Sequence, residues 1–273
     1  MKTENKLNFI SFTKNFGMKK IIKLLLKTIP RPLLIRLSFL ARKPLALIYK
    51  GTNVECPVCE KRFRKFLPYG YGKANKDNRL CPNCLSLERH RLLWLYLKNK
   101  TGFFSDKMTV LHMAPEQPFL KKFKQLKNLN YTTADLYSPI VDVKTDIRNL
   151  VFEDNKFDFL ICNHVLEHID DEQKAMKEIL RVLKPGGKAI LQVPIDYLLE
   201  KTFEDPNITS PKDREKYYGQ YDHVRQYGKD YAERLKKAGF EVKEDNFVNS
   251  FSEEEQNKYR FDKNELIYLC KKP

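Results

Sequence analysis

Four cysteines in two matched pairs are the residues of this sequence best suited to chemistry. Cys56 and Cys59 stand in "CPVC", and Cys81 and Cys84 stand in "CPNC" after 21 intervening residues. Each pair places two thiolates about one turn apart, and four thiolates are the soft ligand set that tetrahedral Zn²⁺ takes at about 2.3 Å. Because four protein ligands leave no open coordination position, we expect a structural zinc ribbon here.

A second candidate site lies in "TVLHMAPEQPFLKKF", residues 109–123. A strand, a short loop and an amphipathic helix follow one another, as in a nucleotide-binding turn. Such loops usually carry glycines so that the backbone can approach the ligand, whereas this one carries Ala114, Pro115 and Glu116. We expect the small Ala114 and the fixed φ of Pro115 to make the turn. The alternative is a site that no longer binds a cofactor.

The elements that must position these residues change character along the chain. From residue 108 onward, strand and helix patterns alternate, which predicts an α/β sheet. We expect helices at 117–127, 172–183 and 229–238, the last closed by Gly239 in a left-handed conformation. The predicted strands are 109–113, 130–134, 141–144, 157–162, 188–194, 240–245 and 265–270.

One long segment of this sheet resembles a known family. "FDFLICNHVLEHIDDEQKAMKEILRVLKPGGKAILQVP", residues 157–194, is similar to the fourth-to-fifth-strand region of class I S-adenosylmethionine-dependent methyltransferases, of the type 11 kind. The resemblance extends over 108–273. It implies a Rossmann-like, seven-stranded, mostly parallel sheet with helices on both faces and an antiparallel last strand. "HMAPE" behind a zinc ribbon also resembles a subgroup found beside sugar-assembly enzymes.

The resemblance implies a binding site for S-adenosylmethionine. The loop after the first strand would wrap the methionine part, an acidic residue ending the second strand would bind the ribose, and an Asp with an apolar neighbour would bracket the adenine. Residues after the fourth strand would line the methyl end. In this sequence the corresponding residues are His112, Ala114, Pro115, Glu116, Asp135, Leu136, Asp146, Ile147, Asn163 and His164.

Methyl transfer to a hydroxyl needs a base as well as alignment of the acceptor. The candidates are His168 and His223, with His164 as a further one, although each could instead make a structural hydrogen bond at a turn. A long insertion at about 195–227 should cover the acceptor, since a loop of this length in a compact domain is usually functional. Its expected acceptor-binding residues are Tyr221, Asp222, Arg225 and Tyr227.

Charge and apolar patterning separate the N-terminal part from the rest. Residues 1–100 hold 23 Lys and Arg against 5 Asp and Glu, whereas 101–273 hold 28 against 30. We predict a basic amphipathic helical segment at 1–50, the zinc ribbon and a linking helix at 51–100, and the methyltransferase domain at 101–273. The first segment predicts either an anchor on an anionic membrane surface or helices packed on their own domain or a dimer partner.

Cysteine usage indicates a reducing compartment, because two CxxC pairs and two cysteines in apolar strands do not make a disulfide framework. No secretory signal or membrane-spanning stretch is evident, because charged residues and prolines interrupt the apolar run of residues 21–49. The expected location is therefore the cytoplasm. The membrane-anchor interpretation of residues 1–50 would add peripheral attachment to the inner face of the cytoplasmic membrane, whereas the packed-helix alternative would not.

Several functions fit these observations. The favoured one is O-methylation of a sugar hydroxyl or carboxylate in a glycan or lipid-linked glycan. An RNA methyltransferase that grips phosphates with its basic third is the main alternative, but no "NPPY"-type amine-binding motif follows the fourth strand. Another small-molecule acceptor and a catalytically inactive binding module are the remaining hypotheses. The sequence leaves the oligomeric state open.

Overall fold

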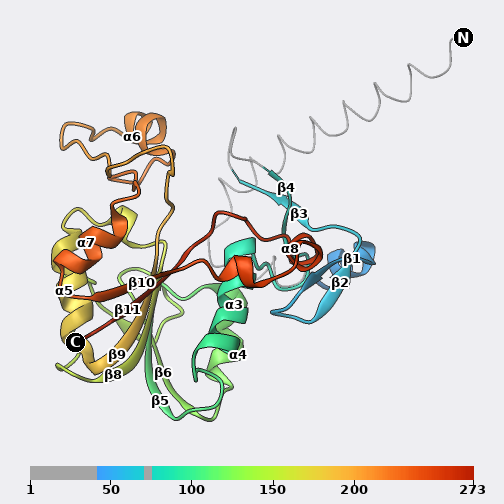
Figure 1. Cartoon of the computed structure of the whole chain (residues 1–273), viewed down its shortest axis with the longest axis horizontal. Helices are drawn as coiled ribbons and strands as arrows, with labels where there is room; N and C mark the ends of the chain where they lie inside the picture. Colours follow the sequence, from blue (N-terminus) through green and yellow to red (C-terminus); the bar gives the residue numbers. More distant parts are fainter. Residues whose placement is uncertain (1–41, 71–75) are drawn as a thin grey trace, which may run out of the picture. The chain divides into compact units, whose positions relative to one another are not determined.

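The computed structural model describes residues 42–70 and 76–273 (Figure 1). The chain divides into two compact units, 1–50 and 51–273. In the first unit residues 42–48 are helical, while the amphipathic helices predicted before them lie outside the described residues. None of the described helices is both long enough and apolar enough to cross a bilayer.

A seven-stranded sheet forms the centre of the second unit, in the order β10-β11-β9-β8-β5-β6-β7. This confirms the predicted α/β class and the number of strands. The strands are β5 (Met108–Met113), β6 (Leu129–Asp135), β7 (Val143–Lys144), β8 (Phe157–Asn163), β9 (Leu183–Gln192), β10 (Glu241–Asp245) and β11 (Ile267–Lys271).

The order of the strands reverses at β5, which is where a ligand crevice is expected. β9, β8, β5, β6 and β7 pair in parallel, whereas β11 is antiparallel to both β9 and β10, as the resemblance implied. The chain runs from β5 outward to β6 and β7, and then returns to β8 on the other side of β5. Ligands of open α/β sheets bind at the carboxyl ends of the strands where the order reverses in this way.

Helices cover both faces of the sheet, α5 and α7 on one side and α3 and α4 on the other (Figure 1). The first pair packs through Met176, Ile179 and Leu235 into one apolar cluster. The second pair packs together through stacked rings of Trp94 and Phe123, whose centroids lie 5.9 Å apart, and Phe123 meets Tyr131 of β6 at 5.8 Å. The helices are α3 (Glu88–Lys100), α4 (Gln117–Lys124), α5 (Glu172–Val182), α6 (Pro211–Tyr218), α7 (Tyr231–Lys237) and α8 (Glu253–Tyr259).

Two small hairpins precede this domain and lie in the same compact unit. β1 (Lys50–Cys56) pairs with β2 (Lys61–Phe63), and β3 (Leu67–Tyr69) pairs with β4 (Lys76–Leu80). Each hairpin is adjacent to one cysteine pair, so the hairpins bring the two CxxC turns together. The chain then enters α3, which leads directly into the sheet.

The predicted insertion has structure of its own. It contains α6, which is capped at its start by Ser210, whose hydroxyl accepts from the backbone N–H of Asp213, and at its end by Gly219 with φ +81°. Short bridges pair Ile195 with Tyr227 and Phe203 with Gln226, so the two ends of the insertion lie side by side. Neither α6 nor α8 follows from the apolar periodicity, since both expose most of their residues.

Candidate functional site

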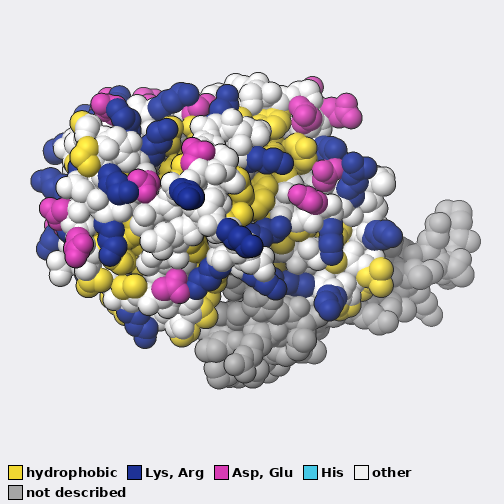
Figure 2. Space-filling model, turned by 90° about the horizontal axis from the view of Figure 1, so that it is seen from below, with side chains coloured by type: hydrophobic (Ala, Val, Ile, Leu, Met, Phe, Trp, Pro, Cys, Tyr) yellow, Lys and Arg dark blue, Asp and Glu magenta, His cyan; other side chains and the backbone are white. Residues whose placement is uncertain are grey.

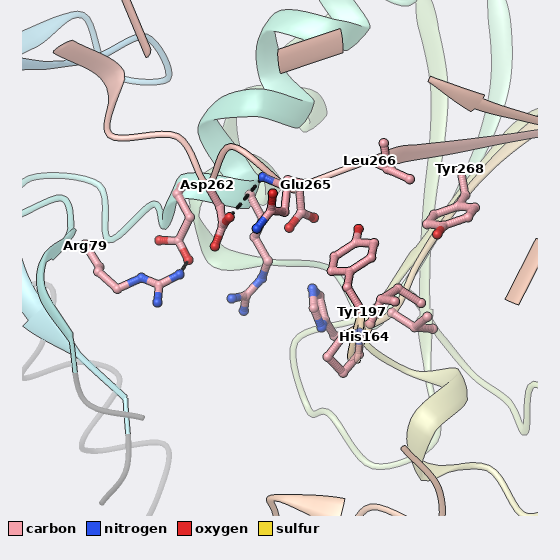
Figure 3. A pocket seen from close by; sticks show the side chains of 13 residues that line it. Arg79, His164, Tyr197, Asp262, Glu265, Leu266 and Tyr268 are labelled. Carbon is pink, nitrogen blue, oxygen red and sulfur yellow. Dashed lines mark hydrogen bonds and ion pairs between the residues drawn. The ribbon is translucent and has the colours of Figure 1, made fainter. Parts of the chain in front are cut away.

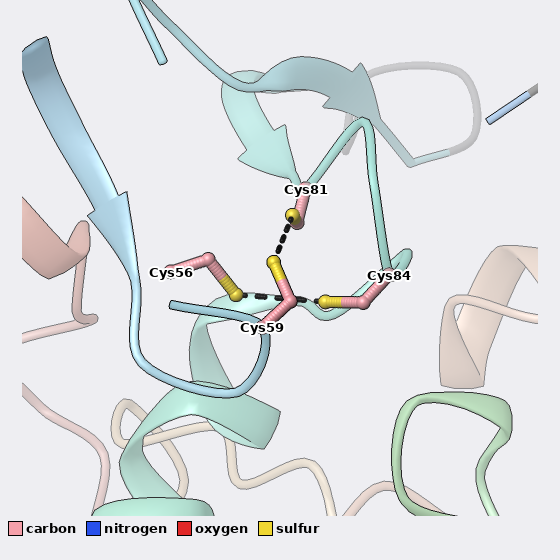
Figure 4. Close-up of side chains that lie close together, drawn as sticks. All are labelled: Cys56, Cys59, Cys81 and Cys84. Carbon is pink, nitrogen blue, oxygen red and sulfur yellow. Dashed lines mark hydrogen bonds between the residues drawn. The ribbon is translucent and has the colours of Figure 1, made fainter. Parts of the chain in front are cut away.

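The four cysteines converge as the ligand hypothesis requires (Figure 4). The Sγ atoms of Cys56 and Cys84 are 3.5 Å apart, and those of Cys59 and Cys81 are 3.7 Å apart. A tetrahedral ion with bonds of about 2.3 Å places sulfur ligands roughly 3.8 Å from one another. The donor set and its spacing therefore fit Zn²⁺, and all four thiols are free of disulfides.

Buried polar groups support the cluster from outside. The Ser86 hydroxyl lies 3.1 Å from the sulfur of Cys56 and 3.3 Å from that of Cys84. The guanidinium of Arg91, from α3, donates to the carbonyl oxygens of Arg79 and Ser86 at 2.9 Å each. These contacts orient the second cysteine turn against the helix that follows it.

The glycine-free loop forms the turn in an unexpected way. Ala114 adopts φ +44°, in the left-handed region that glycine usually occupies. Its N–H donates to the carbonyl of Ala134 at 2.8 Å, which fixes the loop to the end of β6. The turn therefore uses the smallest side chain that still carries a Cβ, and the next residue, Pro115, contributes its restricted φ.

Glu116 is the centre of a buried network at this loop. Its carboxylate lies 2.5 Å from Nε2 of His112 and accepts from Nδ2 of Asn163 at 2.8 Å. Burial alone would raise the pKa of this carboxyl, but the charge of His112 and the bonds from His112 and Asn163 hold the pKa at about 2. The ring of His90, from α3, has its Nε2 atom 4.0 Å from the same carboxylate. The loop is thus fastened to β5, β8 and α3.

Asp135 ends β6, where the resemblance implies the ribose-binding acid. Its Oδ1 atom accepts from the backbone N–H groups of Tyr137 and Ser138 at 2.7 and 2.6 Å. The hydrogen bonds of the described residues thus engage one carboxylate oxygen and leave Oδ2 for a ligand. The adjacent Leu136 is 42% exposed, so it offers apolar surface beside the carboxylate.

Asp146 and Ile147 are engaged within the protein. Both oxygens of Asp146 accept from the guanidinium of Arg148, and Oδ1 also accepts from the backbone N–H of that residue. The side chain of Ile147 lies in the apolar core. A contact between Asp146 and an adenine ring would therefore share the carboxylate with Arg148, and the adenine role of both residues stays a prediction.

Two buried atoms at the end of β8 lack partners among the described residues, and they test the fit of the cofactor. Asn163 is 6% exposed and its Oδ1 atom is unpaired, as is Nε2 of the next residue, His164. An unpaired buried polar atom costs about 1–3 kcal/mol. The ammonium group of S-adenosylmethionine is a donor that would satisfy Oδ1, so the residues present fit this cofactor.

His168 and His223 lie together although 55 residues separate them. Their ring centroids are 4.8 Å apart at an interplanar angle of 81°. The Nδ1 atom of His168 is 3.3 Å from the carbonyl oxygen of Asp222, and Nδ1 of His223 is 3.2 Å from that of Tyr218. The structure therefore brings the two predicted bases into one cluster. Each ring also makes a hydrogen bond to a backbone carbonyl, as expected if its role were only structural.

A cavity of about 270 Å³ opens beside His164. Arg79 of the ribbon and Asp262 lie on one side of it, and His164 and Tyr197 face them from the other (Figure 3). Arg89 from α3 lines the same cavity. Its walls thus carry both charges, and the ribbon, α3, the insertion and the segment before β11 all contribute.

One further residue of this cavity has an altered acidity. Glu265 accepts from the side-chain amide of Gln192 at 3.3 Å. Burial raises the pKa of this carboxyl, and the neighbouring charges of His164 and Arg89 oppose the shift only in part. A carboxyl that ionises closer to neutral pH inside a cavity is a feature of functional sites.

The insertion residues expected to bind the acceptor do not line this cavity. Arg225 is 3% exposed and donates to the carbonyls of Leu166, Ile169 and Asp170. The hydroxyl of Tyr227, also buried, donates to Glu172. Tyr221 is 61% exposed and Asp222 lies beside His168, so neither reaches the cavity wall. The insertion reaches it through its first residues, which include Tyr197.

The cavity residues from the ribbon and α3 were missed by the sequence reasoning. The signal was present in "SLERHR", residues 86–91, because four charged or polar side chains, Glu88 to Arg91, precede the apolar stretch of the helix. Glu88, His90 and Arg91 are all buried there, which is rare for such residues unless they are paired. From its apolar periodicity alone, this stretch was interpreted as a helix that packs the ribbon on the main domain.

Comparison with known proteins finds a family match over part of the chain. Residues 98–191 match the family model described as a methyltransferase domain. A sterol 4-C-methyltransferase of Caenorhabditis elegans is 33% identical over 32% of this chain and 25% of its own length. An uncharacterised protein of Methanocaldococcus jannaschii is 36% identical over 34% of this chain and 42% of its own length. The chain thus spans less than half the length of these curated relatives.

Solved structures show remote likenesses. A 1,6-didemethyltoxoflavin-N1-methyltransferase of Burkholderia thailandensis is 14% identical, with a TM-score of 0.43 over 66% of this chain and 76% of its own. The [4+2]-cyclase SpnF is 18% identical, with a TM-score of 0.45 over 69% of this chain and 84% of its own. Similarity at this level does not identify an acceptor.

Proposed function

We propose that this chain, which carries an S-adenosylmethionine-dependent methyltransferase domain, methylates a sugar hydroxyl in a glycan or lipid-linked glycan. The observation that supports a sugar acceptor is the mixture of positive and negative side chains in the cavity beside His164. Sugar hydroxyls both donate and accept, so they suit the carboxylates of Asp262 and Glu265 together with the guanidinium of Arg89. A sugar carboxylate, paired with an arginine, is the related acceptor.

The cofactor would occupy the crevice at the ends of β5, β6 and β8. Bound S-adenosylmethionine supplies a methyl group on a positively charged sulfur. Asp135 would hold the ribose, while the loop 112–116 and Asn163 would hold the methionine part. His164 directly follows Asn163 and lines the cavity, so an acceptor in the cavity would lie next to the methyl end. Alignment of this kind supplies much of the catalysis of an in-line displacement.

In this proposal, the acceptor hydroxyl is deprotonated at the cluster that contains His168 and His223. This cluster adjoins His164, because Nδ1 of His164 lies 3.3 Å from the buried carboxylate of Glu167. His168 and His223 are equivalent candidates for the direct base, because Nδ1 of each ring lies within 3.3 Å of a backbone carbonyl oxygen.

The four cysteines, we propose, hold a structural Zn²⁺. Arg79 precedes Cys81 by two residues, and Glu88 and Arg89 follow Cys84 closely. The metal would therefore fix one wall of the acceptor cavity without touching the acceptor. Two observations support this role, namely the closed set of four sulfur ligands and the position of the cavity residues on either side of the second cysteine turn.

RNA methylation is the second candidate, and the basic N-terminal third favours it. On the face shown in Figure 2, however, Asp and Glu side chains lie among the Lys and Arg side chains of the described residues. The cavity itself carries Glu88, Asp262 and Glu265, which would repel phosphate groups. These carboxylates therefore favour a sugar acceptor over RNA.

The test is an acceptor comparison with the full-length protein and methyl-labelled S-adenosylmethionine. We expect label in lipid-linked glycans and not in structured RNA, and alkali treatment separates a stable ether from a labile ester. Arg89→Gln should raise the acceptor KM at least about tenfold with unchanged cofactor affinity. Lys98→Gln, at an exposed position of the same helix, is the matched control. Label in RNA, or an unchanged acceptor KM in Arg89→Gln, would refute the proposal.

A further inference from the structure

We propose that Glu167, His168 and His223 bind a divalent transition-metal ion, at a site distinct from the four cysteines. One potential ligand atom of each residue lies within 4.8 Å of the other two. Two imidazoles and one carboxylate suit Mn²⁺, Fe²⁺, Co²⁺ or Zn²⁺. Three protein ligands leave coordination positions open, which distinguishes a site for chemistry from the closed cysteine site.

The hydrogen bonds of the two rings prepare them for coordination. Each histidine has its Nδ1 atom within 3.3 Å of a backbone carbonyl, which can only accept a hydrogen bond. A neutral ring that donates through Nδ1 keeps its lone pair on Nε2. Histidines that ligate metals are commonly oriented by such a bond from the other nitrogen. In that tautomer, both rings of the cluster offer Nε2 as a ligand atom.

Glu167 provides evidence for a bound cation that is independent of the cluster geometry. Its side chain is buried, with the residue 1% exposed, and its Oε2 atom lacks a hydrogen-bond partner among the described residues. Its Oε1 atom faces Nδ1 of His164 at 3.3 Å. A buried carboxylate oxygen without a partner is costly, and native structures rarely contain one without a ligand, an ion or a function to explain it. A cation between Glu167 and the two histidines would remove this cost.

The third ligand is held in place by the end of the insertion. The N–H of Val224, next to His223, donates to the carbonyl of Glu167 at 2.9 Å. Arg225 donates to the carbonyl of Leu166 at 2.8 Å. These bonds tie the insertion to η2 (Leu166–His168), which carries the other two ligands. The three side chains thus meet through backbone contacts that fix their positions.

The role of the ion deepens the proposed function and rests on it. His164 lines the acceptor cavity and contacts Glu167, so the ion would lie at that end of the cavity. Its open positions suit two adjacent sugar hydroxyls, and coordination lowers the pKa of a bound hydroxyl. With the ion bound, His168 and His223 are its ligands and no longer act as bases. The hydroxyl proton therefore passes to water, the oxygen bonds to the methyl carbon, and the C–S bond breaks with its electron pair left on sulfur. The products are a methyl ether, S-adenosylhomocysteine and one proton.

Mn²⁺ binding tests the site without reference to activity, because a thiolate site is a poor match for this ion. We expect electron paramagnetic resonance to show one Mn²⁺ bound per full-length chain. His223→Ala and Glu167→Gln should weaken this binding at least about 100-fold. Glu215→Gln, an exposed carboxylate on α6 of the same insertion, should bind Mn²⁺ as the wild type does. Circular dichroism checks that each variant is folded.

The outcomes separate the two proposals. A wild-type chain that binds no Mn²⁺ at millimolar concentration, or a folded His223→Ala that binds it equally well, would overturn the metal site. Glycan methylation that resists chelators would also count against the site and leave the proposed function intact. Specific Mn²⁺ binding without methylation of any glycan would support the site and refute the sugar acceptor.

Discussion

Ala114 shows how one residue can stand in for a glycine motif. Its φ of +44° lies in a region where an L-residue pays about 1–2 kcal/mol. The bond from its N–H to Ala134 and the network around Glu116 hold the loop in this conformation. S-adenosylmethionine carries no phosphate, so the loop does not need the dense backbone cradle that a dinucleotide requires. The absence of glycines is thus compatible with a cofactor loop.

Asp135 gives the most direct test of the cofactor site. We expect Asp135→Ala to weaken S-adenosylmethionine binding by about 1–3 kcal/mol, because the ribose hydroxyls would lose a buried acceptor. Isothermal titration calorimetry measures the change. Asp135→Asn, which can still accept from Tyr137 and Ser138, separates loss of the turn from loss of the ligand contact. Equal affinity in wild type and alanine variant would place the ribose elsewhere.

Glu116 should make the free energy of unfolding depend on pH in the acidic range. Its pKa of about 2 in the folded chain lies below its ordinary value of 4.5, so its contribution is complete above pH 4.5. The contribution, about 3 kcal/mol from the shift, is lost as pH falls from 4.5 towards 2. Urea unfolding of wild type and Glu116→Gln at pH 7 and pH 3 measures it. We expect the difference in unfolding free energy between the two proteins to shrink at the lower pH, and a constant difference would contradict the assignment.

At the scale of elements, the proposed function makes the ribbon and α3 part of the acceptor site. Arg79, Glu88 and Arg89 all line the cavity, and the cysteine cluster lies between Arg79 and the helix that carries the other two. Loss of the metal should therefore change acceptor binding before it changes cofactor binding, because Asp135 and Asn163 belong to strands of the sheet.

Cys81→Ser tests this coupling. We expect one zinc per chain in the purified wild type, little or none in the variant, and an acceptor KM raised about tenfold or more at nearly unchanged cofactor affinity. Metal analysis and steady-state kinetics provide the measurements. Asn83→Ala, within the same turn, should keep its zinc and its KM. Unchanged metal content in Cys81→Ser would exclude the four-cysteine site.

The elements of the sheet could be predicted well, and those around the site less well. β5 and β8 are central and buried, so their apolar runs locate them, and the closing Gly239 takes φ +108° as expected. β9 begins at Leu183 instead of near 188, because the "KPGG" stretch pairs irregularly at the start of β8. The positions of Arg89 and Glu265 could not be inferred, since their proximity depends on tertiary contacts that no local pattern encodes.

For the molecule as a whole, the division at residue 50 separates the basic start of the chain from the enzyme. We expect removal of residues 1–49 to spare activity on a soluble acceptor analogue, because every described site residue lies beyond them. The same truncation should abolish association with anionic vesicles, since the predicted amphipathic segment is lost. Sedimentation with vesicles of anionic and neutral lipid provides the measurement. A truncated chain that still sediments would show that the membrane contact lies elsewhere.

Arg91 links the two ends of the enzyme unit. Its buried guanidinium donates to carbonyls of the ribbon, at Arg79 and Ser86, and also to those of Tyr259 and Arg260, more than 160 residues later. During synthesis the ribbon leaves the ribosome long before residues 259 and 260 do. The hydrogen bonding of α3, which supports the cysteine pairs, can therefore be completed only after residues 259 and 260 have been synthesised.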